Sequence, residues 1–112
     1  MIDKNFVFLE GVVGDDYKYM KTRDGKDFAT FTLYINSFNK EYRDKTETAI
    51  YVHIRIMVFD ARLVEYLKKV KPRNGNRVSI LGRLNSHKNE YKGTELWQND
   101  VVVRDIHIIK TK

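Results

Sequence analysis

The sequence contains no cysteine, which excludes disulfide bonds, thiolate metal sites and a cysteine nucleophile. It has no apolar run that approaches the roughly 18 residues of a membrane span, and its start, MIDKNFVFLE, lacks the cationic segment and apolar stretch of a signal peptide. It also has no repeat, low-complexity tract or linker. We therefore predict a single domain over residues 1–112 that resides in the cytoplasm.

Acidic side chains are fewer than basic ones, since 15 Asp and Glu stand against 21 Lys and Arg, and the formal net charge is +6. Such an excess favours a polyanionic partner or an acidic membrane surface. Many basic domains carry their charge only for solubility, so charge alone does not decide the partner. The shares of 42% hydrophobic and 32% charged residues are typical of a folded domain rather than a disordered chain.

Alternation of apolar and polar residues with a period of two predicts five β-strands. They cover residues 6–14, 28–36, 50–59, 77–86 and 96–109. Asp24-Gly25 predicts a hairpin turn ahead of the second strand, and Asn74-Gly75 predicts the turn ahead of the fourth. Gly11 inside the first strand predicts a bulge or tight bend. Polar stretches at 37–48 and around 87–96 predict two long loops.

One helix is predicted between the third and fourth strands. Asp60 is a suitable N-cap, and Pro72 prevents the helix from continuing. The apolar face of this helix comprises Leu63, Val64, Leu67 and Val70. Five strands with one helix in this position is the order of an OB-fold, an all-β Greek-key barrel that binds oligonucleotides across its second and third strands. Because a barrel of this size fills its interior with side chains, a ligand must lie outside.

The strand at residues 50–59 has an unusual outer face. Its inner face carries Val52, Ile54, Ile56 and Val58. Its outer face carries Tyr51, His53, Arg55, Met57 and Phe59. Exposed aromatic surface of this kind marks an interface. Single-stranded nucleic acid fits, because bases stack on aromatic rings at about 1–3 kcal/mol each while Arg and Lys contact phosphates. The alternative is that part of this face packs against another subunit or the helix.

The two predicted loops repeat this mixture of aromatic and cationic residues. The first contains Phe38, Lys40, Tyr42, Arg43 and Lys45. The second contains or adjoins His87, Lys88, Tyr91, Lys92 and Trp97. Loops of this composition can wrap a single strand of nucleic acid. For Trp97 an alternative of equal weight stands, since the only tryptophan of a small domain often anchors its core.

No catalytic or metal site is predicted. The three histidines lie on separate elements without metal-ligand spacing, and no serine stands in a nucleophile-elbow context. Asp15, Asp16 and Asp24 could be imagined as the carboxylates of a nuclease. Consecutive strand or turn residues point in different directions, however, so we do not expect these side chains to converge on one site. We therefore expect a solvated turn there, no enzymatic activity and no cofactor.

Stretches along nearly the whole chain carry a resemblance to one family. They are NFVFLEGVVGDD at 5–16, TRDGKDFATFTLYIN at 22–36, EYRDK at 41–45, IRIMVF at 54–59, EYLKK at 65–69, NRVSILGRLNS at 76–86 and, more weakly, VVV at 101–103. Their order and spacing resemble the OB domain of the bacterial-type single-stranded DNA-binding proteins (SSB). The resemblance implies a homotetramer, with a dimer as the alternative, that wraps single-stranded DNA without sequence preference in replication, recombination or repair.

By position, the resemblance implies that Tyr42 and Phe59 stack on bases. It also implies that basic residues lie along the DNA path, namely Lys45, Arg55, Lys69 and Lys88. His53 and Asn89 stand at or near places where a stacking tryptophan is common, which predicts that stacking is weakened or moved to Tyr51 and Tyr91. The predicted DNA-binding set is Tyr42, Lys45, Tyr51, His53, Arg55, Phe59, Lys69, Lys88, Tyr91 and Trp97.

The chain stops at IIKTK, without the disordered linker and acidic tip by which the family usually recruits replication and repair proteins. We expect either that a tail was removed or that the protein is a tailless relative, such as one from a phage or mobile element. Two other functions remain open. One is a primosome-like OB-fold accessory that acts mainly through protein contacts, and the other is single-stranded RNA binding, since stacking and phosphate contacts do not distinguish the sugar.

Overall fold

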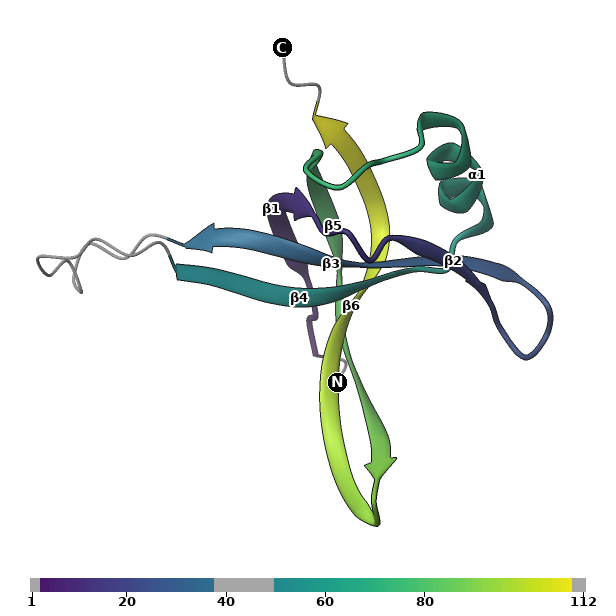
Figure 1. Ribbon diagram of the computed structural model, residues 1–112, viewed down its shortest axis with the longest axis vertical. Helices are drawn as coiled ribbons and strands as arrows, with labels where there is room; N and C mark the ends of the chain where they lie inside the picture. Colours follow the sequence, from purple (N-terminus) through teal and green to yellow (C-terminus); the bar gives the residue numbers. More distant parts are fainter. Residues whose placement is uncertain (1–2, 38–49, 110–112) are drawn as a thin grey trace, which may run out of the picture.

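The computed structural model describes residues 3–37 and 50–109, and Figure 1 shows their arrangement. The elements along the chain are β1 (Val7–Val13), β2 (Lys18–Lys21), β3 (Asp27–Ser37), β4 (Ile50–Val58), α1 (Ala61–Val70), β5 (Arg77–Tyr91) and β6 (Thr94–Ile109). The Asp24-Gly25 turn between β2 and β3 is present as predicted, with Gly25 at a φ of 81°.

Five of these strands close into a barrel. Their order is β1-β5-β6-β4-β3, and β3 pairs back onto β1 at Val12 and Val13. Neighbouring strands are antiparallel except β4 and β6, which run parallel. The five-stranded OB-fold barrel with one helix before its fourth strand is therefore confirmed. β2 is an additional short strand outside the ring, where it pairs with β3.

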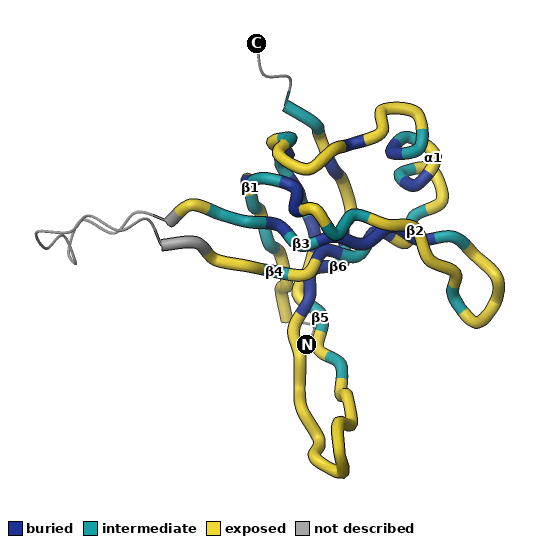
Figure 2. Tube along the Cα trace, viewed as in Figure 1, coloured by how far each residue is buried: buried dark blue, intermediate teal, exposed yellow. Residues whose placement is uncertain are grey.

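The predicted inner faces fill the barrel. Ala29, Phe31 and Leu33 of β3 are fully buried. Figure 2 shows the buried chain where the strands cross and exposed chain along the projecting hairpins. Val52, predicted to be inside, is 46% exposed, because β4 continues past the closed barrel. A ligand must therefore bind outside the barrel, as expected.

The helix α1 has the predicted start and end. The Asp60 carboxylate accepts the backbone N–H groups of Arg62 at 2.8 Å and Leu63 at 3.4 Å, which makes Asp60 the N-cap. Lys71 has a left-handed φ of 50° and donates its N–H to the Leu67 carbonyl, and Pro72 follows. In the described part of the chain, no helix is long and apolar enough to cross a membrane.

Two glycines mark close contacts between strands. A Cβ on Gly82 would lie 2.4 Å from the Val102 carbonyl oxygen, and one on Gly11 would lie 2.5 Å from the Tyr34 carbonyl oxygen. β1 pairs with β5 through Gly11 without a register shift, so of the two alternatives predicted there, a bulge or a tight bend, the bulge is wrong. The register shift lies instead between Leu81 and Gly82, where β5 approaches β6.

Residues 86–99 form a two-stranded hairpin that projects from the barrel, and we call it the hairpin arm (Figure 1). Its strands stay paired to Tyr91 and Thr94, and the turn residues Lys92 and Gly93 have φ of 51° and 78°. Two positive φ values suit the twist of a hairpin. The predicted loop around 87–96 is therefore wrong. Most side chains of this arm are exposed and polar, so no apolar alternation signals the strands.

Candidate nucleic-acid interface

A groove of about 760 Å³ lies outside the barrel, between the β2–β3–β4 face and the hairpin arm. The sheet contributes Lys18 and Met20 from β2, Phe28 and Thr30 from β3, and Arg55 and Met57 from β4. The β5–β6 side contributes His87, Asn89, Gln98, Asn99 and Asp100. One wall is thus cationic and apolar, and the other is made of amides, a histidine and an acid.

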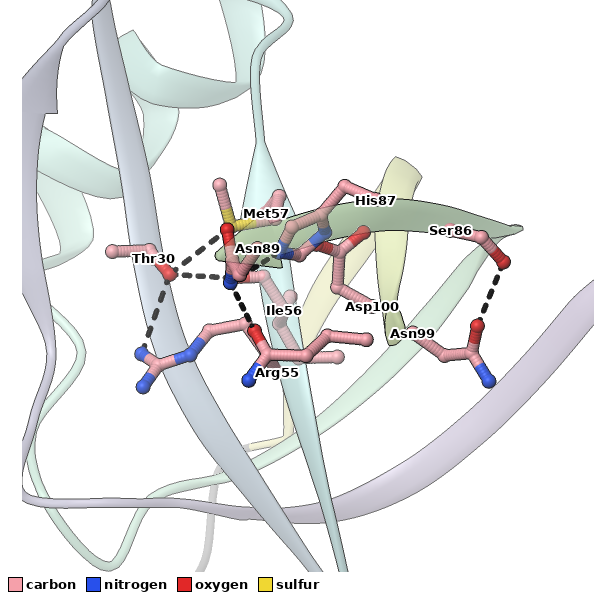
Figure 3. A network of polar contacts seen from close by, with 10 residues as sticks. Thr30, Arg55, Ile56, Met57, Ser86, His87, Asn89, Asn99 and Asp100 are labelled. Carbon is pink, nitrogen blue, oxygen red and sulfur yellow. Dashed lines mark hydrogen bonds and ion pairs between the residues drawn. The ribbon is translucent and has the colours of Figure 1, made fainter. Parts of the chain in front are cut away.

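The apolar wall is built from ring and thioether surface. Phe28 is 9% exposed and packs against Phe59, with ring centroids 5.0 Å apart at 36°. Thr30 donates its hydroxyl to the Ile56 carbonyl at 3.0 Å, and its Oγ1 lies 3.3 Å from the Met57 sulfur. The floor under the groove is therefore fixed by the packing of Phe28 and by the contacts of the Thr30 hydroxyl, and Figure 3 shows the latter.

Arg55 reaches the groove in a position set by Asp16. Its Nη1 lies 3.2 Å from Asp16 Oδ2 and 3.5 Å from Thr30 Oγ1. Asp16 in turn accepts the backbone N–H of Thr32 at 2.8 Å and the Thr32 hydroxyl at 2.6 Å. The Arg55 side chain stays 43% exposed, so it can meet a phosphate without first being ordered.

Burial alone would raise the pKa of the Asp16 carboxyl. The hydrogen bonds from Thr32 and the charge of Arg55 outweigh burial and hold this pKa below its usual range. The carboxylate is therefore the form that the fold stabilises.

Asp16→Asn is expected to lower the free energy of unfolding at neutral pH and to have less effect in acid. A carboxyl with a lowered folded-state pKa stabilises the fold above its unfolded pKa of about 3.9, and this contribution is lost as the pH falls through the folded pKa. Urea unfolding of both proteins from neutral pH to about pH 2 measures the difference. If the difference in free energy of unfolding between the parent and Asp16→Asn does not become smaller in acid, this role of Asp16 is wrong. Asp15→Asn, which changes an exposed neighbouring carboxylate, is the control.

The polar wall is an ordered network. Asn89 Nδ2 donates to Gln98 Oε1 at 2.6 Å and lies 3.3 Å from His87 Nε2. His87 Nδ1 lies 3.0 Å from Asp100 Oδ2 (Figure 3). Where a stacking ring is common in the resembled family, near Asn89, this chain thus places hydrogen-bonding groups.

The other face of the hairpin arm carries an aromatic ring beside a cation. Lys88 and Trp97 are paired in register and alternate with groove-lining neighbours, so they point away from the groove. Trp97 is 70% exposed with Lys88 Nζ 5.9 Å from its ring centre, and Lys88 also forms a 2.8 Å ion pair with Glu95. Tyr91 is 63% exposed near the turn and shares the face of His87 and Asn89. The alternative that Trp97 anchors the core is therefore excluded.

The remaining predicted site residues lie around these surfaces. Tyr42 and Lys45 lie outside the described residues, and only the backbone of Tyr51 is described. His53 is exposed further along β4, where its ring meets Tyr34 edge-on at 4.6 Å.

Phe59 and Lys69 do not line the groove, although one cavity beside Phe59 shares Met57, His87 and Asp100 with the groove. Phe59 is 44% exposed and lines two smaller cavities, of about 370 and 240 Å³, beyond its contact with Phe28. Lys69 is exposed in the last turn of α1 and does not line the groove.

Sequence reasoning did not find much of the groove lining, namely Lys18, Met20, Phe28, Gln98, Asn99 and Asp100. The alternation in YKYMK could have indicated that Lys18 and Met20 share one face of a short strand. No local pattern marks Asp100, because it joins the site only through the parallel pairing of β4 and β6, opposite Arg55.

Residues 4–109, from before β1 to the end of β6, match the model of the single-strand binding protein family. A solved structure of Plasmodium falciparum SSB in complex with ssDNA has a similar fold, with a TM-score of 0.83, 25% sequence identity and 98% of each chain covered. No curated protein matches the chain in sequence.

Proposed function

The chain belongs to the single-strand binding protein family, and from this premise we propose that it binds single-stranded DNA and protects it in replication, recombination or repair. The single observation that carries the proposal is the groove, which combines ring surface with the exposed guanidinium of Arg55 beside an arm with exposed aromatic rings. The function is binding, with no catalytic step. Since the ligand is DNA, we place the protein in the cytoplasm on the nucleoid.

In this proposal the phosphates and bases meet different side chains. Arg55 and Lys18 contact phosphates in the groove, and Lys88 does so on the outer face of the arm. Bases stack on exposed rings, because every base offers a π face. The proposed contact set further includes Tyr42, Lys45, Tyr51, His53, Phe59, Lys69, Tyr91 and Trp97.

Titration of the intrinsic fluorescence with oligo(dT) tests this function, because the only tryptophan stands exposed on the arm. We expect quenching and an affinity that falls steeply with salt. A primosome-like accessory acting through protein contacts would show little of either. Parallel titration with oligo(rU) distinguishes a preference for RNA.

Arg55→Gln is expected to reduce the slope of log K against log salt by about one unit, because one phosphate contact is lost. The slope is measured from oligo(dT) titrations at several salt concentrations. Arg62→Gln removes the same charge from an exposed site on α1 and should leave the slope nearly unchanged. Equal slopes for the parent and Arg55→Gln would remove Arg55 from the DNA path.

We also propose that the protein assembles as a homotetramer, with a dimer as the alternative. Phe6 and Phe8 support an interface, since they are 68% and 73% exposed at and beside the start of β1. Among the described strands, β1 pairs only with β5 from Val7 to Gly11, so its other edge is available. Light scattering with and without oligo(dT) gives the subunit number of the free and bound protein.

A further inference from the structure

The carboxylate of Asp100 lies in the groove with one oxygen unused. The residue is 3% exposed, and its Oδ2 is 3.0 Å from His87 Nδ1. Within residues 3–37 and 50–109, its Oδ1 has no hydrogen-bond partner. Nearly all buried polar atoms in proteins have a partner, and an unpaired buried acceptor destabilises the fold. We therefore expect a ligand or a water molecule to donate a hydrogen bond to Oδ1.

The cationic register partner of Asp100 does not supply that donor. Arg55 is the register partner of Asp100 across the parallel β4–β6 pair, and both line the groove. The Arg55 guanidinium, however, points to Asp16 and Thr30. The Asp100 carboxylate thus stays available beside a positive group that can hold a phosphate.

The arm does not supply the donor either. His87 Nδ1 lies 3.0 Å from Asp100 Oδ2, and Asn89 Nδ2 lies 3.3 Å from the other ring nitrogen of His87, Nε2. The same Asn89 amide group also donates to Gln98. His87 therefore serves Oδ2 of Asp100 and the Asn89 amide serves Gln98, so neither side chain supplies a donor to Oδ1.

We propose that the groove selects bases with an exocyclic amino group over thymine and uracil, and that Asp100 Oδ1 accepts a hydrogen bond from that amino group. This inference rests on the proposed function. An amino group, such as N4 of cytosine, is the donor that Asp and Glu accept from bases. Thymine offers a carbonyl oxygen at the same position, which the carboxylate repels. Asp100 is then a specificity-determining residue in an otherwise sequence-tolerant surface.

His87 governs access to this oxygen. Oδ1 is closed to solvent in the free protein, while the His87 side chain is 40% exposed and lies against the carboxylate. In the proposed complex a small shift of the His87 ring opens Oδ1 to the groove, the amino group donates to Oδ1, and His87 keeps its contact with Oδ2.

Competition between oligo(5-methyl-dC) and oligo(dT) of equal length tests the proposal on the full chain. The two bases share the methyl group and differ in the amino group and the N3 hydrogen. We expect the amino-bearing oligomer to bind roughly fivefold more tightly or better. In Asp100→Asn the ratio should fall to near one. Asp105→Asn, which changes an exposed acid of the same strand, should keep the ratio of the parent.

Each outcome decides the matter. Equal affinities in the parent would mean that water satisfies Asp100, and an unchanged ratio in Asp100→Asn would mean that another group reads the base. If neither oligomer binds, the proposed function itself fails. Should Asp100→Asn not fold, replacing cytosine by 2-pyrimidinone, which lacks only the amino group, makes the same test on the parent protein. Loss of the preference supports the proposal, and its persistence overturns it.

Discussion

Phe31→Ala is expected to lower the free energy of unfolding by about 3–5 kcal/mol. Phe31 is fully buried in the barrel and stacks on Tyr17, with ring centroids 5.6 Å apart at 29°. Removing the phenyl group leaves a cavity that the strands cannot close, because each strand of the barrel is held by its paired neighbours. Urea unfolding followed by circular dichroism measures the change.

Phe8→Ala is the matched control, since it deletes the same atoms from a side chain that is 73% exposed. In the isolated subunit it should change the free energy of unfolding by less than about 0.5 kcal/mol. If β1 forms the proposed interface, its effect grows with protein concentration. A Phe31→Ala variant as stable as Phe8→Ala would mean that the barrel interior is packed differently.

Trp97→Ala is expected to weaken oligo(dT) binding by about 1–3 kcal/mol while leaving the unfolding transition nearly unchanged. The ring is 70% exposed, so it adds little to folding, but it offers a flat surface beside Lys88. Because the substitution removes the only tryptophan, anisotropy of a labelled oligo(dT) is the suitable measurement.

Leu96→Ala serves as the comparison for Trp97→Ala. Leu96 is 46% exposed on the opposite face of the same arm and has no π surface, so its loss should change affinity little. If Leu96→Ala is as damaging as Trp97→Ala, the strand is bound through the shape of the arm rather than by stacking on its outer face.

The barrel could be predicted because its signals are local. Alternation in β3 separates the buried Ala29, Phe31 and Leu33 from an outer face, and Asp60 marks the first turn of α1 by its own hydrogen bonds. Such patterns arise from one strand or one helix turn, so a single sequence reveals them.

The groove and the arm could not be predicted in the same way. Exposed residues cover both faces of most of the arm, which removes the contrast on which strand prediction depends. The meeting of Arg55 with Asp100 follows from a parallel pairing across the barrel, and no spacing along the chain encodes it. The aromatic and basic residues indicated the type of ligand from the sequence alone, whereas the hydrogen-bonding wall of the groove could be recognised only from the three-dimensional structure.

The contact between Asp16 and Thr32 has a consequence for self-association. At this point β3 passes from its pairing with β1 to its pairing with β2, and the carboxylate takes the place of a strand carbonyl for the Thr32 N–H. An open donor on a sheet edge is a template for another chain's strand, and so for aggregation. The Asp16 carboxylate thereby occupies the one Thr32 N–H that another strand could bind at this point of the sheet. Loss of this carboxylate should make the concentrated protein more prone to form intermolecular β-structure.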